Sequence, residues 1–101
     1  LGAANVIVAG DTAVDLVDAL RQLSDRSLRR IAAEGGPSLL ADLLASGVVD
    51  EVALTISPKV VAGQHPRISH GTDLDLAFTP RLLLEHEGTL MGRWLRSVNA
   101  G

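Results

Sequence analysis

The sequence predicts an α/β fold in which a mostly parallel sheet ends in an antiparallel C-terminal hairpin. Short apolar segments alternate with segments of helical periodicity in the first half of the chain, which is the pattern of parallel strand–helix units. The last part of the chain instead contains two apolar segments on either side of a tight turn, which is typical of a hairpin. Together these features predict a mixed sheet with helices on its faces.

The first strand–helix unit is expected near the N-terminus. Val6–Ala9 is a β-branched apolar run of the kind found in a parallel sheet that is covered on both faces. Apolar residues then recur at helical spacing from Ala13 to Leu23. Thr12 and Asp15 resemble a capping box with Asp in place of Glu, so the helix is predicted to begin just after Thr12.

A second unit follows, with a short strand at Arg29–Ala33 and then a helix. Gly36 can serve as the N-cap of this helix, and Pro37 suits its first position because no backbone N–H is needed there. Gly47 is a natural residue for the position after the helix ends. The apolar stripe of the helix consists of Leu39, Leu40, Leu43 and Leu44.

The remaining elements are predicted to be strands. Val52–Ser57 is a third strand that Pro58 ends, and residues 58–80 are mostly loop. Arg81–His86 and Leu90–Val98 form the hairpin, with the turn at Glu87–Thr89.

Composition excludes several classes of function. The chain has 101 residues, which is one domain or less, and carries a net charge of −3 with one Trp, one Phe, no Tyr and a single Lys. A nucleic-acid surface is therefore not expected, because there is no basic stripe and no stacking platform. The absence of Cys excludes disulfides and thiolate metal sites and fits a reducing cytosol. No apolar run approaches the ~20 residues that a membrane-spanning helix needs.

The start of the chain suggests an incomplete domain. Leu1 stands in place of an initiator Met, and the first predicted strand follows almost at once. Since a central strand of a parallel sheet needs neighbours on both sides, we expect residues 1–101 to be part of one larger domain. The alternative is a small complete domain with a trimmed N-terminus.

The best candidate for a binding site is the turn Glu34-Gly35-Gly36-Pro37-Ser38-Leu39. It follows a predicted strand and opens a helix, where open α/β sheets bind ligands. The backbone N–H groups of Ser38 and Leu39 have no partner within a helix and suit a phosphate or diphosphate. Glu34 is placed to hydrogen-bond an uncharged part of the same ligand. The alternative is that Gly-Gly-Pro forms only a tight connection.

Other candidate sites are weaker. Gly10-Asp11-Thr12 also joins a strand to a helix, but capping explains Thr12 fully. The three His residues lack metal-ligand spacing, so no metal is expected. No residue is a compelling general acid, and we therefore name no catalytic residue.

Three segments carry a resemblance to a known family. Ala33–Leu40, Leu43–Glu51 and Leu54–Gly63 are similar to the "E-G-G-P-x-L … G-L-V-D-E … P-x-x-x-G" signature of the reductase domain of riboflavin biosynthesis. That domain belongs to the dihydrofolate reductase-like superfamily. The resemblance spans nearly all of the chain and implies a dihydrofolate-reductase-like three-layer fold, with residues 1–101 as the C-terminal part of a single reductase domain.

The resemblance also implies a chemistry. Enzymes of this type use NADPH to reduce the ribose of a ribosylamino-pyrimidine phosphate to a ribityl chain. Gly35, Gly36, Pro37, Ser38 and Leu39 correspond to the cofactor-phosphate turn, and Glu34 corresponds to a substrate-contacting acid. Members commonly form homodimers. The candidate interface residues here are Leu82, Leu84, Met91 and Leu95.

One departure leaves the substrate open. Gln64-His65-Pro66-Arg67 replaces the small or Gly-rich residues that usually follow P-x-x-x-G. The substrate is then the riboflavin intermediate, a folate-like pterin, or another carbonyl or imine compound. An alternative from a different class is a nucleotide-binding or dimerising half-domain without catalysis.

Overall fold

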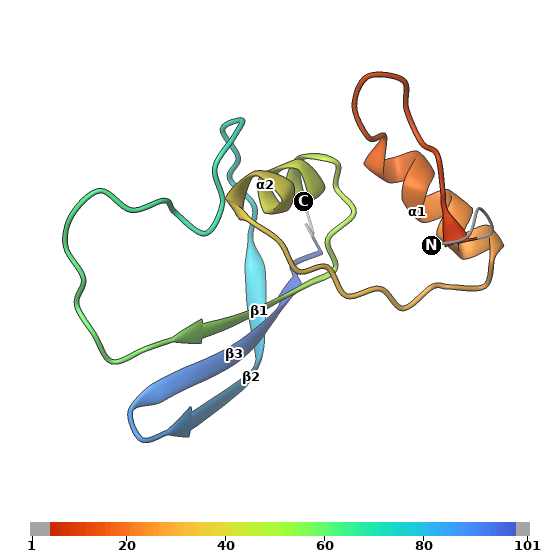
Figure 1. Ribbon diagram of the computed structural model, residues 1–101. Coiled ribbons are helices and arrows are strands. Elements are labelled where there is room, and N and C mark those ends of the chain that lie inside the picture. Colours follow the sequence, from red (N-terminus) through yellow and green to blue (C-terminus); the bar gives the residue numbers. More distant parts are fainter. Residues whose placement is uncertain (1–4, 99–101) are drawn as a thin grey trace.

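The computed structural model describes residues 5–98, which form two helices and one three-stranded sheet (Figure 1). The elements are α1 (Leu16–Asp25), α2 (Pro37–Ala45), β1 (Glu51–Ile56), β2 (Phe78–His86) and β3 (Thr89–Arg96). The strand order is β1-β3-β2, and both pairings are antiparallel. The β2–β3 hairpin extends away from the helices (Figure 1). Neither helix in the described region is long and apolar enough to cross a membrane.

The parallel part of the predicted sheet is wrong for the described residues. Neither Val6–Ala9 nor Arg29–Ala33 is a strand, because neither has a neighbouring strand to complete its ladder of hydrogen bonds. The first segment instead lies against α1. The Ala9 carbonyl accepts the Asp15 N–H at 3.1 Å, and the Val8 carbonyl accepts the Gln22 side-chain amide at 2.8 Å.

Helix α1 begins at Leu16, three residues later than predicted. Its N-cap is Asp15, whose carboxylate accepts the Asp18 N–H at 3.0 Å. The predicted cap at Thr12 is therefore wrong, because Asp15 is an equally good capping residue and lies nearer the apolar stripe. On the exposed face, the Arg21 guanidinium hydrogen-bonds Asp18 and holds the pKa of that carboxyl below its usual value.

The predicted ends of α2 are confirmed. Gly36 is the N-cap and Pro37 the first helical residue. At the other end Gly47 has φ +72°, and its N–H donates to the Leu44 carbonyl at 3.1 Å while Val48 N–H reaches the Leu43 carbonyl at 3.5 Å. These bonds form a Schellman motif.

The predicted strand after α2 and the hairpin are also confirmed, with ends shifted by a few residues. Strand β1 pairs with β3 so that Val52 lies opposite Trp94 and Leu54 opposite Gly92. The hairpin turn needs only Glu87 and Gly88, with φ of +50° and +82°, as a type I′ turn requires. Arg93 hydrogen-bonds Glu51 across β1 and β3 at 2.9 Å and lowers the pKa of that carboxyl.

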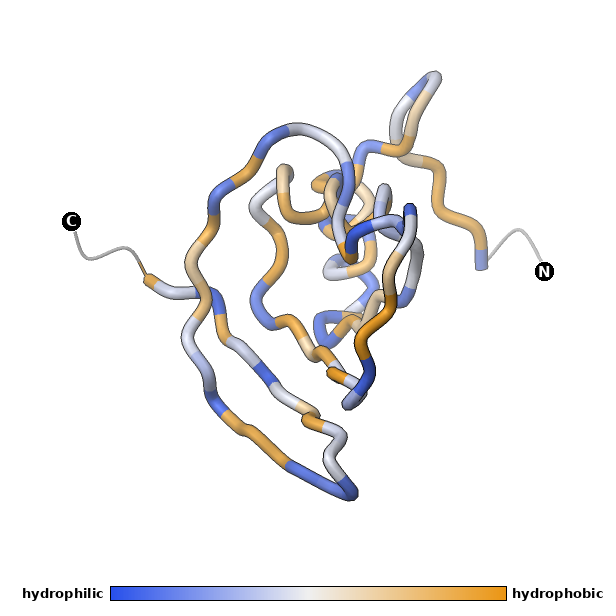
Figure 2. The backbone as a smooth tube through the Cα atoms, turned by 90° about the vertical axis from the view of Figure 1, so that its left-hand side faces the viewer, coloured by the Kyte–Doolittle hydropathy of each residue, from blue (hydrophilic) through white to orange (hydrophobic). Residues whose placement is uncertain are grey.

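The described residues bury little apolar surface. Ala41 of α2, at 3% exposure, is the one buried hydrophobic residue among them. Large apolar side chains lie open on the hairpin, where Leu83 is 61% exposed and Leu84 52%. Figure 2 shows this apolar stretch along the hairpin beside its polar turn. Helix α2 and the sheet therefore present surfaces that nothing within residues 5–98 covers.

A Gly92→Ala substitution tests the packing of the sheet. A Cβ at Gly92 would lie 2.4 Å from the Trp94 ring, so the indole must move off the strand. We expect altered tryptophan emission and a loss of about 1–3 kcal/mol in the free energy of unfolding. Trp94 is the one Trp of residues 1–101, so a change in emission between wild type and this variant reports on the surroundings of Trp94. Met91→Leu, on the opposite face of β3, should leave the emission unchanged.

Candidate functional site

The predicted binding turn, Glu34–Leu39, lies at the start of α2, and its backbone N–H donors have no partners within the helix. Gly36, the N-cap, has φ −77° and ψ 178°. The first helical hydrogen bond runs from the Leu40 N–H to the Gly36 carbonyl at 3.2 Å. The N–H groups of Ser38 and Leu39 come before this bond and have no acceptor inside the helix. They form a site that suits an anion.

The two helices of the described region differ at their N-termini. In α1 the Asp15 carboxylate caps the first turn and Asp18 adds a second negative charge. In α2 no side chain caps the first turn, and no acidic residue lies within it. Since the positive end of the helix dipole favours a negative group, the start of α2 can accept an anion from outside the described chain.

The glycines of the turn leave space for such a ligand. A Cβ built on Gly36 would have no atom within 4 Å, and its φ is one that any residue adopts. The described chain therefore leaves room for a Cβ at this position, where glycine also serves as a favourable N-cap residue. A Cβ on Gly35 would meet the Leu39 side chain, at 2.7 Å from its Cδ2 and 3.4 Å from its Cβ. A close approach by a phosphate is a physical reason for glycine at Gly36, so these residues fit a dinucleotide cofactor.

Glu34 lies on the extended segment just before the turn and is exposed. Along the chain, Gly35 and Gly36 lie between Glu34 and the first turn of α2. A carboxylate repels a phosphate but accepts hydrogen bonds from hydroxyl or amino groups. The geometry therefore leaves Glu34 available to an uncharged part of a ligand.

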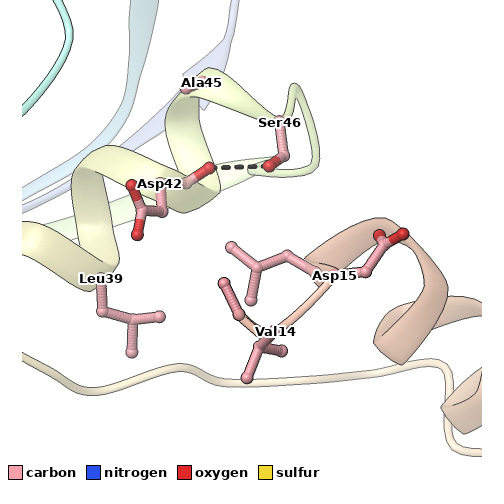
Figure 3. Close-up of a pocket in the computed structure, with 8 residues that line it drawn as sticks. Val14, Asp15, Leu39, Asp42, Ala45 and Ser46 are labelled. Atoms are coloured by element: carbon pink, nitrogen blue, oxygen red, sulfur yellow. Dashed lines mark hydrogen bonds between the residues drawn. The ribbon is translucent and has the colours of Figure 1, made fainter. Parts of the chain in front are cut away.

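A cleft of about 580 Å³ opens beside the turn, between the start of α1 and the outer face of α2 (Figure 3). Its lining includes Val14, Asp15, Leu39, Asp42, Ala45 and Ser46. Leu39 connects the turn to this cleft, with Val14 on the other side (Figure 3). The Ser46 hydroxyl donates to the Asp42 carbonyl at 2.8 Å.

Of the predicted cofactor residues, Leu39 lines this cleft, whereas Gly35, Gly36, Pro37 and Ser38 form the turn at its end. Sequence reasoning missed Val14, Asp42 and Ser46. The helical spacing of Leu39, Asp42 and Ser46 puts them on one face of α2, and this was the available signal. The approach of Val14 depends on the path of the chain between the helices, which periodicity does not reveal.

The weaker candidate at Gly10 has a structural explanation. Gly10 has φ +87°, and a Cβ there would lie 2.0 Å from the Ala13 carbonyl oxygen. Glycine is thus required by the tight path of the chain into α1. Across the described residues, no cluster of three His, Cys, Asp or Glu side chains could hold a metal ion.

Comparison with known proteins assigns the family. The sequence profile of the RibD C-terminal domain matches residues 2–91. The chain belongs to the RibD C-terminal domain family. This agrees with the resemblance carried by the turn at Glu34–Leu39 and the segments that follow it.

Curated relatives of this RibD-family chain include proteins named 2,5-diamino-6-ribosylamino-4(3H)-pyrimidinone 5′-phosphate reductase. The one from Methanothermobacter thermautotrophicus is 38% identical over 89 residues, which cover 86% of this chain and 41% of the relative. The one from Aquifex aeolicus is 37% identical over 62 residues, covering 61% of this chain and 28% of the relative. The chain thus spans less than half the length of these relatives.

Solved structures resemble the fold. A pyrimidine reductase-like protein from Corynebacterium diphtheriae superposes with a TM-score of 0.81 at 26% identity, covering 93% of this chain and 40% of that protein. RibD from Acinetobacter baumannii superposes with a TM-score of 0.70 at 21% identity, covering 84% of this chain and 25% of that protein. The arrangement of two helices and an antiparallel sheet is therefore shared with part of each of these two proteins.

Proposed function

We propose that residues 1–101 supply the C-terminal part of a reductase domain that uses NADPH to reduce a ribosylamino-pyrimidine phosphate in riboflavin biosynthesis. The observation that carries this proposal is the Glu34–Leu39 turn at the start of α2, whose first turn no side chain caps, in a chain of the RibD C-terminal domain family. The names of the curated relatives support the substrate class.

In this proposal the turn holds the diphosphate of NADPH. The Ser38 and Leu39 N–H groups donate to phosphate oxygens, and the space beside Gly36 admits them. Pro37 sets the first helical φ without needing a partner for an N–H. When bound, the cofactor supplies the hydride, and the protein's contribution is to orient the reacting groups and exclude water.

Glu34 is proposed to bind the substrate. Its carboxylate is exposed and lies beyond the anion-binding end of α2, so a substrate hydroxyl or amino group is a better partner than a phosphate. Val14 and Leu39 give the adjoining cleft apolar sides, which suit the flat surface of an uncharged ring. The Asp15 and Asp42 carboxylates in that cleft disfavour a phosphate there and favour its placement at the turn.

The assignment as a partial domain is also a proposal. The chain covers 41% of the Methanothermobacter relative, and within residues 5–98 Ala41 alone among hydrophobic residues is buried. Exposed apolar residues such as Leu83, at 61%, are costly in water at roughly 25 cal/mol per Å² of apolar surface. Coverage of these surfaces by the rest of a reductase domain accounts for both observations.

A homodimer is proposed through one face of the hairpin. Leu84 lies opposite Met91, and Leu82 lies opposite Arg93. Because side chains alternate between the faces of a strand, all four predicted interface residues share one face of the sheet: Leu82, Leu84, Met91 and Leu95. Leu82 and Leu84 are 43% and 52% exposed. We expect light scattering to give twice the protomer mass for the complete protein at micromolar concentration. A monomer at that concentration would rule out the dimer.

The test of the proposed function is NADPH consumption by the complete protein. The substrates are 2,5-diamino-6-ribosylamino-4(3H)-pyrimidinone 5′-phosphate, its 5-amino-uracil counterpart, and dihydrofolate as the pterin control. We expect oxidation of NADPH with one of the ribosylamino-pyrimidine phosphates, a ribityl product by mass spectrometry, and little reaction with dihydrofolate. If dihydrofolate is the one substrate that reacts, the proposed substrate class is wrong and a pterin takes its place. If the protein does not bind NADPH, the proposed reductase activity is wrong.

A further inference from the structure

A loop far along the chain lies against the start of α2. The His70 backbone N–H donates to the Pro37 carbonyl at 3.1 Å. Next to it, Gly71 approaches α2 so closely that a Cβ on Gly71 would lie 3.0 Å from the Cβ of Ala41. Ala41 is 3% exposed. The loop therefore reaches the helix through a contact that requires small residues on both sides.

This contact bears on the proposed cofactor site through a single peptide group. The Pro37 carbonyl and the Ser38 N–H belong to the same planar peptide and point in opposite directions. A hydrogen bond from His70 to that carbonyl therefore reinforces the direction that the helix gives the Ser38 N–H. It also polarises the peptide, because hydrogen bonds in a chain strengthen one another.

We propose that Gly71 is a positioning residue for the cofactor turn. It lets the loop approach Ala41 closely enough for the His70 N–H to hold the peptide that presents the Ser38 donor. This inference rests on the proposed function, since it concerns how tightly that turn binds the NADPH diphosphate. The loop follows β1 by more than ten residues, so it couples the region between β1 and β2 to the binding turn.

Gly71→Val tests the inference by titration of the complete protein with NADPH. We expect Kd to rise about tenfold, the equivalent of one weakened charge-assisted hydrogen bond. Hydrogen exchange at the His70 amide should accelerate in the same variant, in the absence of any cofactor. Val60→Ala, at a fully exposed position of the same loop (101%), is the control and should leave Kd and exchange unchanged.

A compensating pair separates positioning from a general loss of stability. Gly71→Ala alone should weaken binding, and adding Ala41→Gly should restore it, because the second change removes the opposing Cβ. Glycine within a helix is destabilising, so the double variant should have a lower Tm and yet a nearly normal Kd. Binding that falls together with Tm in the double variant would overturn the positioning role.

The outcomes distinguish the two proposals. Wild-type protein that fails to bind NADPH rejects the proposed cofactor, and this inference with it. Wild-type binding in the micromolar range with equally tight binding by Gly71→Val rejects the inference alone. Weaker binding with faster His70 exchange in Gly71→Val and recovery in the double variant supports both.

Discussion

Replacing Gly36 with Val is expected to weaken NADPH binding at least about a hundredfold in the complete protein while leaving its fold intact. The Cβ of a residue at Gly36 has no described atom within 4 Å, and the backbone there is extended with φ −77°, so neither the Cβ nor the backbone conformation opposes the substitution. It does occupy the region that the phosphate oxygens need. Loss of two or more charge-assisted contacts at roughly 1.5–3 kcal/mol each gives this factor.

Calorimetric titration with NADPH measures the effect of Gly36→Val, and the thermal unfolding midpoint checks the fold. Gly36→Ala should lie between wild type and Gly36→Val, since its side chain enters less of the same space. Thr12→Val is a matched control at an exposed position before α1 that has no capping role. If Gly36→Val folds and binds NADPH as wild type does, the turn is a structural connection only.

Glu34→Gln is expected to reduce turnover of the substrate while leaving the affinity for the cofactor almost unchanged. The amide keeps the shape of the side chain but removes the negative charge and one acceptor. Because Glu34 lies beyond the first-turn donors of α2, we expect NADPH affinity to stay within about twofold of wild type. The value of kcat/KM for the ribosylamino-pyrimidine phosphate should fall by about ten- to a hundredfold, as loss of a hydrogen bond to a charged group gives roughly 1.5–3 kcal/mol.

Steady-state kinetics with NADPH saturating measures the Glu34→Gln effect, and a separate NADPH titration gives the cofactor affinity. Glu87→Gln, in the exposed hairpin turn, is the control and should change neither quantity. Unchanged kcat/KM in Glu34→Gln would remove Glu34 from the substrate site, and a large loss of NADPH affinity would move it to the cofactor.

The local elements that the sequence determined by itself are those whose signals lie within a few residues. Gly36, Pro37 and Gly47 bound α2 as predicted, because capping and chain reversal depend on the backbone preferences of single residues. The hairpin turn at Glu87-Gly88 follows for the same reason. The E-G-G-P turn and its family resemblance were likewise visible without coordinates, since a short motif carries them.

Which segments pair as strands, and which segments approach one another, was decided only by the tertiary structure. Val6–Ala9 has the composition of a buried strand, yet in the described chain its carbonyls bond Asp15 and Gln22. A strand exists only where a neighbour completes its ladder, and composition does not name that neighbour. The start of α1 is a local matter that the sequence left undecided, because Thr12 and Asp15 are both capping residues and the structure uses Asp15.

The contacts around the turn depend on the tertiary structure as well. His70 and Gly71 come from a loop without periodicity, and only the folded chain brings them to Pro37 and Ala41. Val14 reaches the cleft beside Leu39 for the same reason. The sequence by itself therefore determined which groups could bind an anion, because that property belongs to a helix start. The fold decided what lies around those groups, because long-range contacts depend on the path of the whole chain.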